Sequence, residues 1–125
     1  MPIKPGRSSS VELLVSDGDT AVAAKSGEVP VLGTPRIVAL VEEAAVASIH
    51  SELGVGQTTV SMQVQLDHLA PTAVGHTVTA EATVDKVQGR RVVFTVSVND
   101  ERGLVAVGRV TRVVVDTERF LEKTT

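Results

Sequence analysis

The chain has 125 residues, of which 42% are hydrophobic and 22% charged, and its formal net charge is −3 at pH 7. This size and composition predict a single globular domain. The sequence contains no cysteine and no basic stripe interleaved with aromatic residues. These features exclude disulfides and thiolate chemistry, and they argue against a nucleic-acid-binding surface.

The chain shows no membrane or export signal. Its longest apolar run, near Val113, is too short to cross a bilayer, and the N-terminus lacks the apolar segment of a secretory signal. We therefore expect a cytoplasmic protein with no membrane partner.

The N-terminal third of the sequence predicts little regular structure. Residues 1–9 are expected to form a flexible tail, so that the domain covers residues 10–125. Two short strands are expected at residues 11–15 and 20–24, because both stretches are bounded by turn-forming residues.

A long helix is predicted to begin at Thr34-Pro35. Threonine is favoured as the N-cap and proline at the first helical position. The helix is expected to run to about Glu52 and to stop near Gly54. One helical stripe would face the core: Ile37, Leu40, Val41, Ala44, Ala45 and Ser48.

Four longer strands are predicted after the helix, at residues 57–68, 77–87, 91–99 and 104–116. Short turns join the last three, which makes this part of the sheet antiparallel. The fold class is therefore α+β, with one long central helix and a curled antiparallel sheet of about five strands. A domain this small gains from a partner, so we expect a homodimer that joins two sheets, with a tetramer as the open alternative.

A histidine ends the first of these four strands. Four alternating residues are predicted to share its apolar face: Val60, Met62, Val64 and Leu66. His68 continues that row, and two interpretations are equally weighted: a buried histidine satisfied by a backbone bond, or a functional group. His50 and His76 are expected on the surface, and the three histidines do not have the spacing of metal ligands.

The predicted helix carries two further candidates. Glu42 lies on the shoulder of the apolar stripe, whereas Glu43 falls on the solvated face. Glu42 is either a helix-edge carboxylate with its tip in water or a reactive group. The hydroxyl of Thr34 either caps the helix or meets a substrate beside the free N–H groups of the helix start.

Four stretches carry a family resemblance: "VLGTPRIVALVEEAAV", "VQLDHLAPTAVGHTVTAEATV", "VQGRRVVFTVSVND" and "VGRVTRVVVDTERF". Over roughly residues 29–120 the chain resembles the hotdog-fold acyl-CoA thioesterases, and most of all the fluoroacetyl-CoA thioesterase branch. The pattern H-x-x-P-x-x-x-G before a strand, paired with T-x7-E in a helix, is the most specific part of the resemblance.

The resemblance implies a hotdog fold and the hydrolysis of a short- or medium-chain acyl-CoA to a free acid and coenzyme A. Its catalytic residues fall on Thr34, Glu42 and His68. Glu42 would attack the thioester or activate a water, His68 would assist proton transfer, and Thr34 would position the glutamate or substrate. Thr34 and Glu42 are eight residues apart, about 12 Å along a helix. We therefore expect a site at the dimer interface with groups from both chains.

Coenzyme A would enter only as part of the substrate, and no other cofactor or metal is expected. Its phosphates need cations, for which four arginines on or beside strands are candidates: Arg90, Arg91, Arg109 and Arg112.

Three other functions stay open. The first is a non-catalytic hotdog domain that binds acyl-CoA or another small ligand. Pro35 favours it, because proline removes one N–H from the helix start. So does the short segment before the helix, which lacks the aromatic residues of a lid like that of the type member. The second is a hydratase of the same fold, although this helix lacks the D-x4-H pair of those enzymes. The third is a structural dimerisation module, in which His68 and Glu42 would face no cavity.

Overall fold

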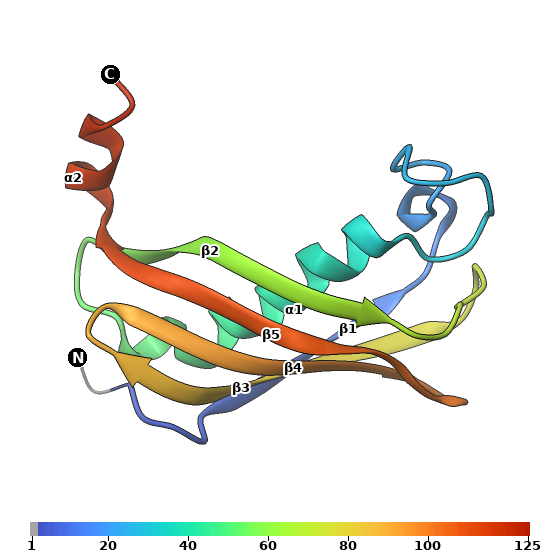
Figure 1. Ribbon diagram of the computed structural model, residues 1–125, viewed down its shortest axis with the longest axis horizontal. Coiled ribbons are helices and arrows are strands. Elements are labelled where there is room, and N and C mark those ends of the chain that lie inside the picture. The colour runs from blue at the N-terminus through green and yellow to red at the C-terminus, as the bar shows by residue number, and fades with distance from the viewer. Residues whose placement is uncertain (1–2) are drawn as a thin grey trace.

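The computed structural model describes residues 3–125 and shows a curled sheet wrapped around one long helix (Figure 1). The elements in chain order are β1 (Ser8–Leu14), η1 (Asp17–Asp19), α1 (Thr34–Ile49), η2 (His50–Glu52), β2 (Gln57–His68), β3 (Thr77–Gln88), β4 (Arg91–Asp100), β5 (Gly103–Asp116) and α2 (Thr117–Glu122). The five strands are antiparallel in the order β1-β3-β4-β5-β2, so β1 and β2 are the edges. The predicted α+β architecture, with one long helix and a curled antiparallel sheet of five strands, is confirmed.

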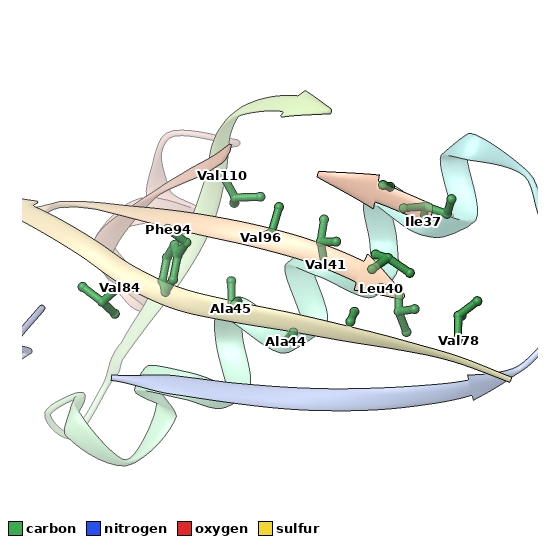
Figure 2. Packing of buried hydrophobic residues seen from close by; sticks show 14 of the residues in the cluster. Ile37, Leu40, Val41, Ala44, Ala45, Val78, Val84, Phe94, Val96 and Val110 are labelled. Carbon is green, nitrogen blue, oxygen red and sulfur yellow. The ribbon is translucent and has the colours of Figure 1, made fainter. Parts of the chain in front are cut away.

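The helix α1 packs on one face of the sheet, which we call the inner face. The predicted stripe is buried along its whole length: Ile37, Leu40, Val41, Ala44, Ala45 and Ser48. Figure 2 shows five of these side chains facing Val78 and Val84 of β3 and Phe94 of β4. Alanines at the middle of the stripe let the helix approach the sheet closely. Each fully buried Leu or Val in such a core stabilises the fold by about 1.5–3 kcal/mol.

The N-terminal segment differs from the predicted tail. Strand β1 begins at Ser8, and Ile3 is only 5% exposed. The amide of Gly6 donates to the carbonyl of Val84, and the amide of Val84 donates to the carbonyl of Arg7. Residues 3–9 are therefore held against β3. Their sequence did not predict this pairing, because backbone groups rather than apolar side chains form the hydrogen bonds to β3. Residues 1–2 of the predicted tail lie outside the described part of the chain.

The strand predicted at residues 20–24 is absent from the described structure, and that prediction is wrong. The segment forms successive turns, with one isolated bridge from Thr20 to Leu32. The Thr20 hydroxyl accepts from the amide of Ala23 and donates to the carbonyl of Asp17. These local bonds satisfy the backbone groups that a strand would have needed to pair elsewhere.

A bulge in β2 changes which residues face the core. The pairing of β2 with β5 shifts between Ser61 and Gln63. One extra residue reverses the alternation of side chains. Met62 therefore lies on the outer face and is 48% exposed, whereas Val64 and Leu66 pack against the core. The predicted apolar row is correct only for its second half, the half that ends in the histidine.

The last element, α2, projects away from the sheet at the end of β5 (Figure 1). Of the other elements it packs mainly against β5. Among residues 3–125, no helix combines the length and the apolar character needed to span a bilayer.

Candidate active site

Thr34 is the first residue of α1, and its hydroxyl is not used as a cap. The N-cap is Gly33, one residue earlier than predicted, and Pro35 follows Thr34 within the first turn. A side chain at Gly33 would meet the backbone nitrogen of Ala21 at 2.9 Å, so the close approach of these two segments requires glycine. The Thr34 hydroxyl is left free to contact another group.

That group is His68, the last residue of β2. Thr34 Oγ1 lies 2.7 Å from His68 Nδ1, across 34 residues of sequence. The backbone explains the meeting, because the amide of Leu32 donates to the carbonyl of Thr72 at 2.9 Å. This bond ties the segment before the helix to the loop after the strand. The two side chains are thus positioned by secondary structure on both sides.

The second ring nitrogen of His68 is buried and unsatisfied. Within the described part of the chain, Nε2 has no hydrogen-bond partner. A buried polar atom without a partner costs about 1–3 kcal/mol. His68 therefore does not fit the interpretation of a buried histidine satisfied by one backbone hydrogen bond. Its Nδ1 contacts the Thr34 side chain, and among the described residues its Nε2 has no hydrogen-bond partner.

Glu42 is held by Arg112 of β5. Arg112 Nη1 donates to Glu42 Oε1 at 2.8 Å, and the two side chains are 10% and 23% exposed, respectively. Arg112 also donates from Nε to Thr59 Oγ1 and from Nη2 to the Thr59 carbonyl, both at 2.9 Å. The carboxylate is thus oriented by a guanidinium that β2 itself fixes in place. Within residues 3–125, Glu42 Oε2 carries no hydrogen bond.

The position of Arg112 differs from the expectation of a surface cation for coenzyme A phosphates. The residue is only 8% exposed, and each of its three guanidinium nitrogens already donates a hydrogen bond within the protein. The sequence contained a signal for this, because Arg112 alternates with Val110 and Val114, which are both buried. An arginine on the inner face of a strand needs a carboxylate nearby, and Glu42 is the one opposite.

The three residues implied by the family resemblance do not all meet within one chain. Thr34 contacts His68, whereas Glu42 contacts Arg112. The eight-residue interval along α1, about 12 Å, separates the two pairs. Each chain therefore holds these residues in two separate clusters on the inner side of the sheet, Thr34 with His68 and Glu42 with Arg112, which we call the candidate half-sites.

The other arginine candidates lie elsewhere. Arg91 and Arg109 line a hollow of about 380 Å³ on the outer face, away from α1, and Arg109 pairs with Asp85 at 2.9 Å. Arg90 lies in the β3–β4 turn and donates from Nη1 to the carbonyl of Val114 at 3.3 Å. In the part of the chain that the structure describes, none of these three arginines forms a hydrogen bond with Thr34, Glu42 or His68.

The remaining histidines are exposed, as predicted. His76 Nδ1 lies 2.5 Å from Glu101 Oε1, and this hydrogen bond lowers the pKa of Glu101.

Glu43 is also exposed, in contrast to Glu42, which lies on the shoulder of the apolar stripe. Among residues 3–125, no cluster of three or more His, Cys, Asp or Glu residues could hold a metal ion.

Solved structures resemble the whole chain. A fluoroacetyl-CoA thioesterase is 25% identical with a TM-score of 0.91, covering 99% of this chain and 96% of its own. A thioesterase superfamily member from Thermus thermophilus is 27% identical with a TM-score of 0.91, covering 98% and 91%. A hot-dog-like protein from Thermanaerovibrio acidaminovorans is 30% identical with a TM-score of 0.90, covering 96% and 89%. No curated protein matches the chain.

The sequence also matches a family model, described as fluoroacetyl-CoA-specific thioesterase, over residues 15–118. This match includes α1, the four long strands and both half-sites. The chain therefore belongs to the fluoroacetyl-CoA-specific thioesterase family, and it is a thioesterase of the hotdog fold.

Proposed function

We propose that this thioesterase hydrolyses a short- or medium-chain acyl-CoA to the free acid and coenzyme A. Its catalytic residues would be Thr34 and His68 of one subunit and Glu42 of a second subunit. Crystal structures of the fluoroacetyl-CoA-specific relative include complexes with acetyl-CoA and with fluoroacetate and coenzyme A. The Val- and Ala-rich interior supports a small acyl pocket rather than a long one.

A homodimer would complete the site. Strand β2 is an edge of the sheet, so its outer backbone groups can pair with the same strand of a second copy. His68 stands at one end of β2, and Thr59, which anchors the Glu42–Arg112 pair, lies near the other end. Antiparallel pairing of two such strands would bring the His68 end of one subunit toward the Glu42 cluster of its partner. Such pairing would complete the site from two subunits although the two candidate half-sites are separated within each chain.

The proposed chemistry gives each of the three residues a role. The partner's Glu42 takes a proton from water, and the water oxygen bonds to the thioester carbonyl carbon. The Thr34 hydroxyl donates to His68 Nδ1, which leaves a proton on Nε2 to stabilise the developing oxyanion. The carbon–sulfur bond then breaks, and the protonated glutamate returns its proton to the leaving thiolate. The products are the acid and free coenzyme A.

The same contact allows a second route. A hydroxyl 2.7 Å from an imidazole nitrogen has the geometry of a nucleophile and its base, so Thr34 could attack the thioester itself. That route passes through an acyl-threonine, whereas attack by water does not. Intact-protein mass spectrometry of rapidly quenched reactions separates them, because only the second route adds the mass of the acyl group.

The observation that carries the proposal is the pair of half-sites: a buried, unsatisfied Nε2 on His68 and a carboxylate oriented by Arg112. The test is thiol release over a panel of acyl-CoA substrates from two carbons upward. Glu42→Gln keeps the shape and an acceptor for Arg112 but removes the base. We expect it to lower kcat/KM by about 10²–10⁴-fold.

The neighbouring carboxylate provides the matched control. Glu43 has the same chemistry one residue away but is exposed, so Glu43→Gln should leave turnover unchanged. Undiminished turnover in Glu42→Gln would contradict the catalytic assignment. Turnover of long-chain substrates in preference to short ones would contradict the proposed acyl length.

A further inference from the structure

The loop between β2 and β3, residues 69–76, contains one buried side chain, that of Thr72. This side chain is in a residue only 2% exposed, whereas its neighbours Pro71 and Ala73 are exposed. The loop starts beside a candidate half-site, because His68 is the last residue of β2. Surface loops are ordinarily more mobile than the strands they join. A single buried anchor in such a loop therefore decides where the backbone around it lies.

Thr72 is held by a carboxylate at the end of β4. Its hydroxyl donates to Asp100 Oδ2 at 3.2 Å, while Oδ1 of the same carboxylate accepts from the amide of Arg102 at 2.8 Å. Asp100 ends β4, and the turn to β5 follows it. The carboxylate is therefore oriented by its own turn, and it holds Thr72 against the β4–β5 hairpin.

The backbone of the same loop holds the segment that leads into α1. The Thr72 carbonyl accepts from the amide of Leu32 at 2.9 Å, and Ala73 forms an isolated bridge with Val31. Leu32 lies two residues before Thr34, the first residue of the helix. The position of Thr72 therefore affects the position of Thr34.

His68 is positioned separately, by the pairing of β2 with β5. It lies opposite Ala106 in the register, and the amides of the two residues after it both donate to the carbonyl of Val105, at 2.8 and 3.2 Å. The imidazole is thus anchored to the sheet, whereas the segment before Thr34 is anchored to the loop. A shift of the loop that leaves the sheet in place would change the distance between the two side chains.

We infer that Thr72 is a positioning residue for the Thr34–His68 pair. Its hydroxyl, held by Asp100, fixes the loop where Thr34 Oγ1 meets His68 Nδ1 at 2.7 Å. The inference rests on the proposed function, because it gives Thr72 an effect on catalysis through that pair. A displacement of about 1 Å in a catalytic arrangement can lower the rate about 10²-fold, so release of the loop from its anchor should be costly.

Removal of the hydroxyl tests this role. Thr72→Val keeps the shape of the side chain but removes the donor to Asp100. We expect kcat for the best acyl-CoA of the panel to fall about tenfold or more, with KM little changed. Thr72→Ser keeps the hydroxyl and should retain most of the wild-type kcat. Unchanged kcat in Thr72→Val, or equal losses in the valine and serine variants, would overturn the inference.

A double variant separates positioning from a general loss of stability. In Thr34→Val the contact with His68 is already absent, so adding Thr72→Val should lower kcat by less than about twofold more. Losses that multiply would show that Thr72 acts independently of the pair, and they would contradict the inference.

A second contact between the same loop and the same hairpin provides the control. His76 Nδ1 contacts Glu101 Oε1 at an exposed position, four residues beyond Thr72. Exposed ion pairs contribute little, so Glu101→Gln should leave kcat within about twofold of wild type. An equal loss in Glu101→Gln and Thr72→Val would contradict a specific role for the buried hydroxyl.

A measurement without substrate separates this inference from the proposed function. The chain has three histidines, so the ring-nitrogen resonances of protein made with isotope-labelled histidine can be assigned by replacing each residue in turn. Thr72→Val should move the Nδ1 resonance of His68 toward its position in Thr34→Val, and Thr72→Ser should not. This movement in a protein that hydrolyses no thioester would contradict the proposed function and leave the positioning of the pair intact. Turnover of acyl-CoA with a resonance that stays in place would contradict the positioning role alone.

Discussion

The hydroxyl of Thr34 is available because α1 is capped one residue earlier, at Gly33. The sequence favoured threonine as the cap, since threonine caps helices well and proline commonly follows the cap. Gly33 is the cap instead, at a position where any side chain would come within 2.9 Å of the backbone nitrogen of Ala21. A packing constraint from a distant segment thus releases Thr34 for its contact with His68.

Thr34 gives a prediction that separates capping from chemistry. Thr34→Val removes the hydrogen bond to His68 Nδ1, so kcat/KM should fall about 10²-fold. The free energy of unfolding should change by less than the ~1 kcal/mol that loss of an N-cap costs. Steady-state thiol release and urea unfolding measure the two quantities. Thr34→Ser, which keeps the hydroxyl, should retain most of the activity, and equal losses in both variants would contradict the role of the hydroxyl.

The catalytic candidates could be named from the sequence only with the help of the family resemblance. Helical periodicity placed Glu42 beside the core, and strand alternation placed His68 facing inward, yet each also fitted an ordinary structural role. Alternation with Val110 and Val114 could have indicated that Arg112 turns inward, but no pattern could show that it binds Glu42, because that contact joins residues 70 positions apart. The unsatisfied Nε2 of His68 likewise depends on packing that no local pattern encodes.

At the scale of elements, η1 fixes the start of α1. Asp19 accepts from the backbone and hydroxyl of Ser16, and its Oδ1 accepts from Arg36 Nε at 3.0 Å. Its own carbonyl accepts from the amide of Gly33. The backbone hydrogen bond from Ser16 is the main reason why the pKa of Asp19 is lowered, and Arg36 adds to the effect.

The lowered pKa predicts a pH-dependent contribution to stability. A carboxyl with a depressed pKa in the folded state stabilises the fold above its unfolded pKa, about 3.9, and loses that contribution as pH falls through the folded value. Asp19→Asn should lower the free energy of unfolding by about 1 kcal/mol at neutral pH. The difference should shrink as the pH falls below about 3.9 and through the lowered folded pKa of Asp19. Urea unfolding at neutral pH and at acidic pH measures this difference, and Asp17→Asn, at an exposed position, is the control. An equal loss of stability in Asp19→Asn at the two pH values would contradict the prediction.

The contact between β5 and β2 depends on a glycine. A side chain at Gly108 would come far too close to the carbonyl of Gln65, so β2 would have to move. Gly108→Ala should therefore lower the free energy of unfolding by about 3 kcal/mol and displace His68 at the end of the same strand. Thermal unfolding and kcat/KM measure the two effects. Gly18→Ala, which meets no atom, is the control; unchanged stability in Gly108→Ala would contradict the tight approach.

The regular elements were predictable where periodicity is long. The buried stripe of α1 and the four long strands follow from patterns of 3.6 and 2 residues. Two regions were not predictable for physical reasons. The N-terminal segment before Val11 gains its partners from β3, and residues 20–24 satisfy their backbone locally. The bulge near Met62 reverses a strand pattern that otherwise continues without interruption.

At the scale of the whole molecule, one chain carries the two candidate half-sites and an open sheet edge at β2. The bond between Thr34 and His68 and the bond between Glu42 and Arg112 are both formed without a partner. What a partner would add is proximity, by pairing β2 with β2 across a two-fold axis. The proposed dimer is thus a requirement of the catalytic assignment, and not only a source of stability.

Complementation between two inactive variants tests this requirement most directly. Glu42→Gln and His68→Ala are purified with different tags, mixed in equal amounts and allowed to exchange subunits, and heterodimers are verified by tandem affinity capture. A site shared between subunits gives each heterodimer one intact set of residues, so the mixture should recover about a quarter of wild-type thiol release. Heterodimers that form but recover no activity would contradict a site built from both chains.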